Sequence, residues 1–111
     1  MTQNTSNSMG QVEMQQCAQD CLTCSSVCSE AAKSQGANSE MASMLQDCAE
    51  LCQVTAHFLQ HNSQLSGYVC QACARVCDHC ANMCEQAGNS DCANACRNAA
   101  WSCGQMAKMV A

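Results

Sequence analysis

The side chains best suited to chemistry in this sequence are its cysteines, which number 14 among 111 residues. Five of them follow one another at gaps of three and four residues: Cys70, Cys73, Cys77, Cys80 and Cys84. On a helix, residues three and four apart share one face, whereas on a strand these gaps would scatter the sulfurs over both faces. Thiolate sulfur is a soft ligand for Cu(I), zinc and iron–sulfur clusters. The spacing therefore predicts a helix that buries a column of metal-binding sulfurs.

The remaining cysteines form three further groups in which every gap is again three, four or seven residues. They are Cys17, Cys21, Cys24 and Cys28; Cys48 and Cys52; and Cys92, Cys96 and Cys103. We expect helices over residues 9–34, 40–61, 64–87 and 91–109, each with its cysteines on one face. The sequence contains no proline, so the commonest helix breaker is absent.

Short polar turns separate these four segments, and short connections make consecutive helices antiparallel neighbours. Gly36 and Gly88 are suited to end the first and third helices, and Asn89 or Ser90 to begin the fourth. We predict an all-α fold, an antiparallel up-down-up-down four-helix bundle with a Cys-lined core, over residues 9–111. Residues 1–8 are expected to form a disordered tail. Because large aliphatic residues are few, Cys, Met and Ala must fill the core.

Composition argues against several classes of function. The net charge is −5 with only four basic residues, so a nucleic-acid partner is not expected. No apolar run approaches the length of a membrane helix. The first 16 residues show neither a charged nor an apolar export region, which favours a cytoplasmic protein. No catalytic constellation stands out, because His79 and Cys80 are adjacent on a helix and do not face each other. We therefore expect a binding protein and not an enzyme.

Three other interpretations of the cysteine pattern compete with copper binding. A disulfide-stapled structural protein would place Cys in loops, whereas two Cys on one helix face have a poor geometry for bridging. Zinc sites with four thiolates would each leave two negative charges in the core. Iron–sulfur ligation usually uses loops, and the 70–84 spacing differs from the ferredoxin pattern and lacks its proline. An iron–sulfur, zinc-binding or disulfide-stapled protein nevertheless remains the alternative.

Cu(I) fits the pattern best, because two or three sulfurs satisfy it and one thiolate per ion leaves the core neutral. Pairs four residues apart on one helix can hold an ion between their sulfurs, while Cys70 and Cys103 would complete sites across helices. Binding must displace protons from buried thiols. The candidate pairs are Cys17/Cys21, Cys24/Cys28, Cys48/Cys52, Cys73/Cys77, Cys80/Cys84 and Cys92/Cys96.

Three stretches resemble the bacterial copper storage protein family. They are Cys17-Ala-Gln-Asp-Cys21-Leu-Thr-Cys24-Ser-Ser-Val-Cys28, Cys70-Gln-Ala-Cys73-Ala-Arg-Val-Cys77-Asp-His-Cys80-Ala-Asn-Met-Cys84, and Cys92-Ala-Asn-Ala-Cys96. The resemblance extends over about residues 14–109. Within the family, the chain resembles the cytosolic class. It implies a four-helix bundle, a homotetramer, storage of multiple Cu(I) ions, and a copper chaperone or copper enzyme as protein partner. The chain departs from the family pattern in two places. The segment 40–61 carries only two Cys, and Ala99 occupies a position suited to a further Cys.

Methionines and histidines gather towards both ends of the expected bundle. Met41, Met44, Met83 and His79 lie towards one end, and the resemblance implies that this end admits copper. We hypothesise that these four residues guide Cu(I) inward. His57 and His61, four residues apart at the other end, have the spacing for a divalent ion but are expected to be a solvated helix end.

Overall fold

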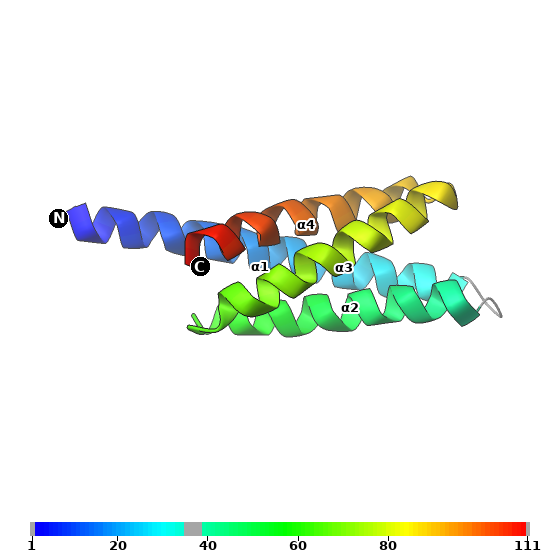
Figure 1. Cartoon of the computed structure of the whole chain (residues 1–111), viewed down its shortest axis with the longest axis horizontal. Helices are drawn as coiled ribbons and strands as arrows, with labels where there is room; N and C mark the ends of the chain where they lie inside the picture. Colours follow the sequence, from blue (N-terminus) through cyan, green and yellow to red (C-terminus); the bar gives the residue numbers. More distant parts are fainter. Residues whose placement is uncertain (1, 35–38, 111) are drawn as a thin grey trace.

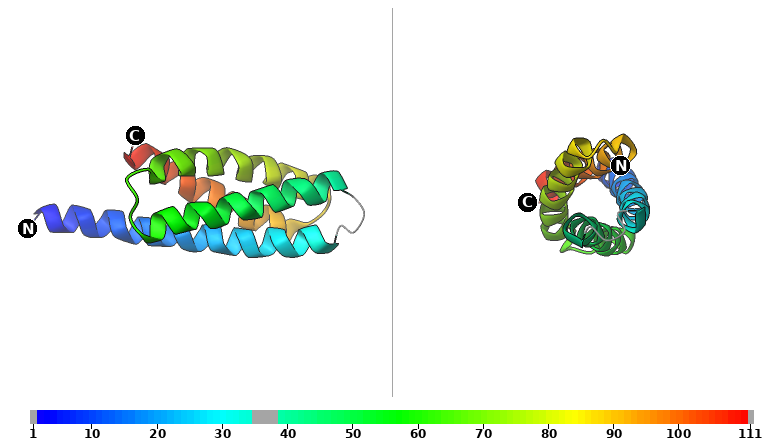
Figure 2. Two further views of the ribbon diagram at one scale, coloured as in Figure 1. Left: turned by 90° about the horizontal axis from the view of Figure 1, so that it is seen from below. Right: turned by 90° about the vertical axis from the view of Figure 1, so that its right-hand side faces the viewer.

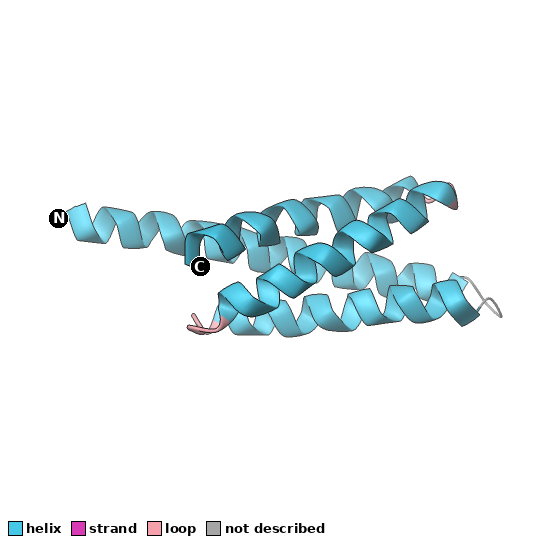
Figure 3. Cartoon of the chain, viewed as in Figure 1, coloured by secondary structure: helices cyan, strands magenta, loops and turns pink. Residues whose placement is uncertain are grey.

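The computed structural model describes the backbone of residues 2–34 and 39–110, with side chains described over 10–34 and 40–108. It contains the helices α1 (Thr2–Ser34), α2 (Ser39–Gln60), α3 (Ser66–Gln86) and α4 (Ser90–Val110), and no strand in the described segments (Figures 1 and 3). The prediction of an all-α four-helix bundle is confirmed. The expected glycine cap at Gly36 lies outside the described residues.

Consecutive helices run antiparallel, so that the chain goes up, down, up and down around a common axis (Figure 2). Helix α1 packs against α2 and α4, and helix α3 packs against α4 and α2. Of these four helix–helix contacts, the one between α2 and α3 is the smallest. In Figure 1, α2 and α3 diverge towards the end that carries the start of α2 and the end of α3. The molecule is accordingly long and narrow, with extents of 55 × 20 × 19 Å.

Helix α1 begins at Thr2, earlier than the start expected near Met9. Its N-terminal turns extend past the ends of the other three helices (Figure 1). Residues 2–9 contain neither proline nor glycine, so no helix breaker interrupts this stretch. Whether residues 1–8 are disordered in solution stays a prediction.

The two described turns use specific backbone conformations. At the end of α2, Asn62 has a φ of 55°, and the Ser63 amide donates to the Phe58 carbonyl at 3.0 Å. Helix α3 starts at Ser66 and not at Gln64 as expected, because residues 63–65 form a turn in which the Ser63 hydroxyl accepts the Leu65 amide at 3.1 Å.

The turn between α3 and α4 agrees with its prediction. Gly88 follows α3 with a φ of 80°, a left-handed conformation that glycine adopts without steric cost. The Asn89 carboxamide oxygen then accepts the Cys92 amide at 3.1 Å and so caps the start of α4.

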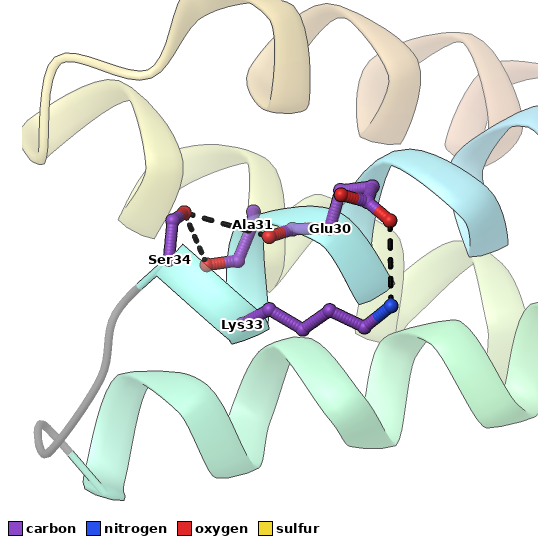
Figure 4. Close-up of polar contacts among 4 residues, drawn as sticks. All are labelled: Glu30, Ala31, Lys33 and Ser34. Atoms are coloured by element: carbon purple, nitrogen blue, oxygen red, sulfur yellow. Dashed lines mark hydrogen bonds and ion pairs between the residues drawn. The ribbon is translucent and has the colours of Figure 1, made fainter.

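Polar contacts complete the last turn of α1 (Figure 4). The Ser34 hydroxyl donates to the carbonyls of Ala31 at 3.0 Å and Glu30 at 3.4 Å, and the Lys33 ammonium pairs with the Glu30 carboxylate at 3.4 Å. A cation in this position also suits the negative end of the helix dipole. Helix α1 therefore ends with its free carbonyls partly satisfied.

The core is made of sulfur and small side chains. All 14 cysteines are buried, and most of the other buried apolar residues are alanines. Leu45, Met106 and Thr55 are the largest fully buried side chains. The faces expected from the sequence are the buried ones, so periodicity correctly identified which side of each helix points inward.

Candidate metal centre

The cysteines form one continuous column of thiols along the bundle axis. All 14 are free and none is more than 2% exposed. Ser25, Thr55, Ser66 and Ser102 are the buried polar residues of the described chain, so no Lys or Arg lies among the sulfurs there. Because all 14 thiols are free, the structure argues against a bundle held together by disulfide bonds.

The middle of the column joins three helices. The sulfurs of Cys24, Cys48, Cys52 and Cys77 all lie within 4.8 Å of one another. Cys77 on α3 is 3.4 Å from Cys52 and 3.8 Å from Cys48, both on α2. Helix α1 contributes Cys24, at 4.0 Å from Cys48. Four sulfurs at these separations can share ions that bridge the helices.

A second group overlaps the first and brings in α4. It consists of Cys24, Cys28, Cys48 and Cys96, again within 4.8 Å of one another. Cys96 lies 3.7 Å from Cys24 and 3.5 Å from Cys28. Because Cys24 and Cys48 belong to both groups, the two are parts of one cluster contributed by all four helices.

Two groups of three flank this centre. Towards the N-terminus of α1, Cys103 lies 3.7 Å from Cys17 and 3.5 Å from Cys21. At the opposite end, Cys80, Cys84 and Cys96 lie within 4.8 Å of one another. Cys103 therefore joins an α1 pair across helices, as its spacing predicted.

The other three cysteines differ in their surroundings. Cys73 lies 3.7 Å from Cys52 and 3.8 Å from Cys77. Cys92 lies 3.8 Å from Cys28 and 2.7 Å from Cys84. Hydrogen bonding with Cys103 on α4 and Cys17 on α1 affects the pKa of Cys70, so this thiol on α3 lies beside the group of three at that end of the bundle.

Burial and neighbouring thiols shift the pKa values in opposite directions. Burial is the largest cause that raises the pKa of Cys84, which donates a hydrogen bond to Cys92. Hydrogen bonds with Cys28 and Cys96 lower the pKa of Cys92 to about 3. The Cys77 pKa is raised, foremost by its hydrogen bonding with Cys24. The pKa shifts run in opposite directions because neighbouring thiols hydrogen-bond with one another, and an incoming cation must displace protons from the thiols whose pKa is raised.

This chemistry favours a monovalent soft cation. No buried cation in the described core balances thiolate charge, so divalent ions with four thiolates each would accumulate negative charge where water is excluded. One Cu(I) per thiolate leaves the core neutral. The overlapping groups also provide sulfurs that can bridge two ions.

The methionine and histidine candidates separate into two kinds. Met41 and Met83 are half-buried and pack against the core. Met44 and His79 instead line a pocket between α2 and α3, together with Cys80. The Cys80 thiol donates to the Met44 carbonyl at 3.9 Å, a contact for which the sequence offers no signal. At the other end, the exposed His57 and His61 rings have centroids 4.9 Å apart.

Comparison with known proteins identifies this type of core. The family model described as "Copper storage protein" matches residues 3–108. The chain belongs to the copper storage protein family. A solved structure is also similar, that of the Nmul_A1745 protein from Nitrosospira multiformis, with 32% identity and a TM-score of 0.82. The similarity covers 87% of this chain and 96% of that one. None of the curated proteins matches.

Membership of the copper storage protein family gives the sulfur column its function. The chain is a copper storage protein that binds multiple Cu(I) ions through clusters of Cys thiolates, and it is not an enzyme. No helix in the described segments has the length and apolar character needed to cross a membrane.

Proposed function

We propose that all 14 thiols of this copper storage protein serve as Cu(I) ligands. The observation that carries the proposal is the continuity of the column, in which groups contributed by all four helices share sulfurs. Because shared sulfurs can bridge ions, filling one group prepares ligands for the next. Each bound Cu(I) takes the place of one thiol proton, so the charge of the core stays constant during filling.

Anaerobic titration of the reduced apoprotein with Cu(I), against a competing chelator, tests this ligand set. We expect uptake to approach one ion per thiol, about 14 in total. Uptake of only one or two ions would reject storage by the column as a whole.

Two variants make the titration specific to the column. Cys77→Ser removes a sulfur that lies 3.4 Å from Cys52 and 3.8 Å from Cys48, and should lower the capacity by about one ion or more. Ala99→Cys adds a sulfur at a fully buried position on the inward face of α4, and should raise it. Exposed Thr23→Ser is the matched control for handling and folding.

We further propose that Met41, Met44, Met83 and His79 guide Cu(I) into the column from the end formed by the start of α2 and the end of α3. Thioether and imidazole groups bind Cu(I) more weakly than thiolate does, so they are suited to passing the ion on. Support comes from their position, since Met41 and Met83 pack against the core and Met44 and His79 line a pocket beside it.

The family resemblance supports a homotetramer and a copper chaperone or copper enzyme as protein partner, and we propose both for this chain. A monomeric mass by light scattering would contradict the tetramer. We also propose a cytoplasmic location of the cytosolic class, because 14 free thiols require a reducing compartment. Recovery of the protein in a periplasmic fraction would contradict this location.

A further inference from the structure

Two of the three histidines of the chain lie together at the end of α2, outside the sulfur column. His57 is in the last turn of the helix, and His61 directly follows its last residue. The His61 amide still donates to the His57 carbonyl at 3.4 Å, so the two residues keep the i, i+4 relation of a single helical turn. Residues in this relation are neighbours on one face of a helix.

That face of α2 is turned away from the core. Both histidines are exposed, whereas Ala56 and Leu59 beside them in sequence are buried. The α2–α3 turn that follows lies at the opposite end of the bundle from the α3–α4 turn (Figure 1). The histidine pair is therefore separate from the thiols, none of which is more than 2% exposed.

The separation of the two imidazole rings suits one shared metal ion. Their centroids are 4.9 Å apart, with 63° between the ring planes. A first-row divalent ion binds an imidazole nitrogen at about 2.0–2.1 Å, which places each ring centroid about 3.2 Å from the ion. Two such rings have centroids about 4.5 Å apart for a right angle at the ion and about 5.2 Å apart for a tetrahedral angle. Because the separation in the structure lies between these values, the backbone already holds the rings at a suitable distance.

The surroundings of the pair favour a cation that exchanges readily. The last turn of a helix carries the negative end of the helix dipole, and the chain has a net charge of −5. His57 and His61 belong to none of the clusters of three or more Cys, His or carboxylate ligand atoms in the described chain. The pair thus supplies two ligands, and the other coordination positions of an ion are open to water.

We propose that His57 and His61 form an external site for one divalent transition-metal ion of intermediate softness: Cu(II), Ni(II) or Zn(II). Imidazole suits all three ions, and Cu(II) should bind most tightly. Binding exchanges two water ligands of the ion for two neutral imidazoles, without a change of oxidation state. The site goes beyond the proposed function, because it uses neither the thiols nor a monovalent ion.

Nickel binding in solution tests the site. Ni(II) is the probe, because imidazole suits it and thiols do not reduce it. The protein is first saturated with Cu(I) to occupy the thiols, and Ni(II) binding is then measured by equilibrium dialysis. We expect a single Ni(II) ion per chain. Two linked donors can exceed the affinity of one by about 10²–10⁴-fold, so His57→Gln and His61→Gln should each weaken binding by about 100-fold or more.

Two further variants control for the number of histidines. His79→Gln removes the third histidine and should bind Ni(II) as the wild type does. Gln46→His/His61→Gln keeps three histidines but moves one to an exposed position on α2 about 16 Å from His57. This variant should bind as weakly as His61→Gln. Wild-type affinity in either single variant of the pair would overturn the proposal, as would tight binding by the relocated variant.

Proton NMR of the same samples identifies the ligands directly. Paramagnetic Ni(II) should broaden the ring signals of His57 and His61 at low occupancy and leave those of His79 sharp. Equal broadening of all three histidines would contradict a shared site. The copper content of the saturated sample is measured separately, and a content of only one or two ions would count against the proposed function. Every variant has the same 14 thiols, so the differences between variants still report the imidazoles alone.

Discussion

Each thiol of the column responds to two opposing influences on its pKa. Burial favours the neutral form, as at Cys84, while hydrogen bonds from neighbouring thiols stabilise a thiolate, as at Cys92. Thiolates less than 4 Å apart repel one another in a core without buried cations, so neighbours cannot all ionise together. Without copper, the folded core must therefore retain many of its protons.

This retention predicts that the apoprotein loses stability in alkali. Unfolded thiols ionise near their ordinary pKa of 9.0, whereas burial raises the pKa of Cys84 in the fold. Above this pH the unfolded chain binds fewer protons than the native chain, so the free energy of unfolding falls as pH rises. Urea unfolding of reduced apoprotein, without oxygen, should show lower stability at pH 10 than at pH 7.

The copper-loaded protein provides the control for this pH series. Its thiols have already exchanged protons for Cu(I), so its stability should change much less between the two pH values. Cys92, whose pKa is lowered to about 3, acts in the opposite direction, because its stabilising effect grows as pH rises towards 9 and is constant above it. Apoprotein that is more stable at pH 10 than at pH 7 would mean that such thiols prevail over those whose pKa is raised.

At the level of single helices, α1 combines two different environments. Residues 17–28 carry Cys17, Cys21, Cys24 and Cys28 in the core, while the first turns of the helix extend past the other helices (Figure 1). An isolated stretch of helix receives no stabilisation from tertiary packing, which supplies most helical stability in proteins. We propose that residues 1–8 unfold readily in solution and that the stable bundle domain begins near residue 9.

Amide hydrogen exchange checks this division of α1. Residues 2–8 should exchange within seconds, as expected for a fraying end, while residues 17–28 should be protected to the level of global unfolding. The second segment is an internal control, because both belong to one continuous helix. Protection of residues 2–8 equal to that of 17–28 would contradict the proposal and indicate that another chain covers this end.

The whole molecule has an unusual source of stability. Its core contains Leu45, Leu59 and Met106 but is otherwise mostly Cys and Ala, so it buries little large apolar surface. Thr55 adds a buried hydroxyl oxygen that has no hydrogen-bond partner among the described residues. Both features limit the stability of the apoprotein. Metal bonds that join all four helices act in the opposite direction.

We therefore expect Cu(I) to raise the melting temperature strongly. A ligand that binds only the folded state adds about 4 kcal/mol when its free concentration is a thousand times its dissociation constant, and several ions add further. Thermal unfolding should shift upwards with each equivalent of Cu(I) and return to the apo value after removal by a chelator.

Zinc is the matched comparison in this experiment. A zinc ion held by four thiolates leaves two negative charges in a core that has no cation to balance them, so equal equivalents of zinc should stabilise less. Equal stabilisation by zinc would show that charge neutrality does not govern the selectivity of this core.

Much of this protein follows from its sequence because helical periodicity is local. Gaps of three and four assigned Cys70, Cys73, Cys77, Cys80 and Cys84 to one face, and that face is buried. The same rule identified the inward faces of the other three helices, and the turn at Gly88 and Asn89 has the caps that its residue types predict. Each of these features depends on contacts within a few residues.

The grouping of sulfurs across helices does not follow from spacing. Periodicity specifies the face of a helix but not its axial offset or its angle to a neighbour, and these quantities decide that Cys103 on α4 meets Cys17 and Cys21 on α1. They also decide that Cys80, alike in sequence to the rest of its column, lines a pocket together with Met44 of α2. Short-range periodicity thus determined the contents of the core, whereas long-range packing determined which sulfurs from different helices lie close enough together to share an ion.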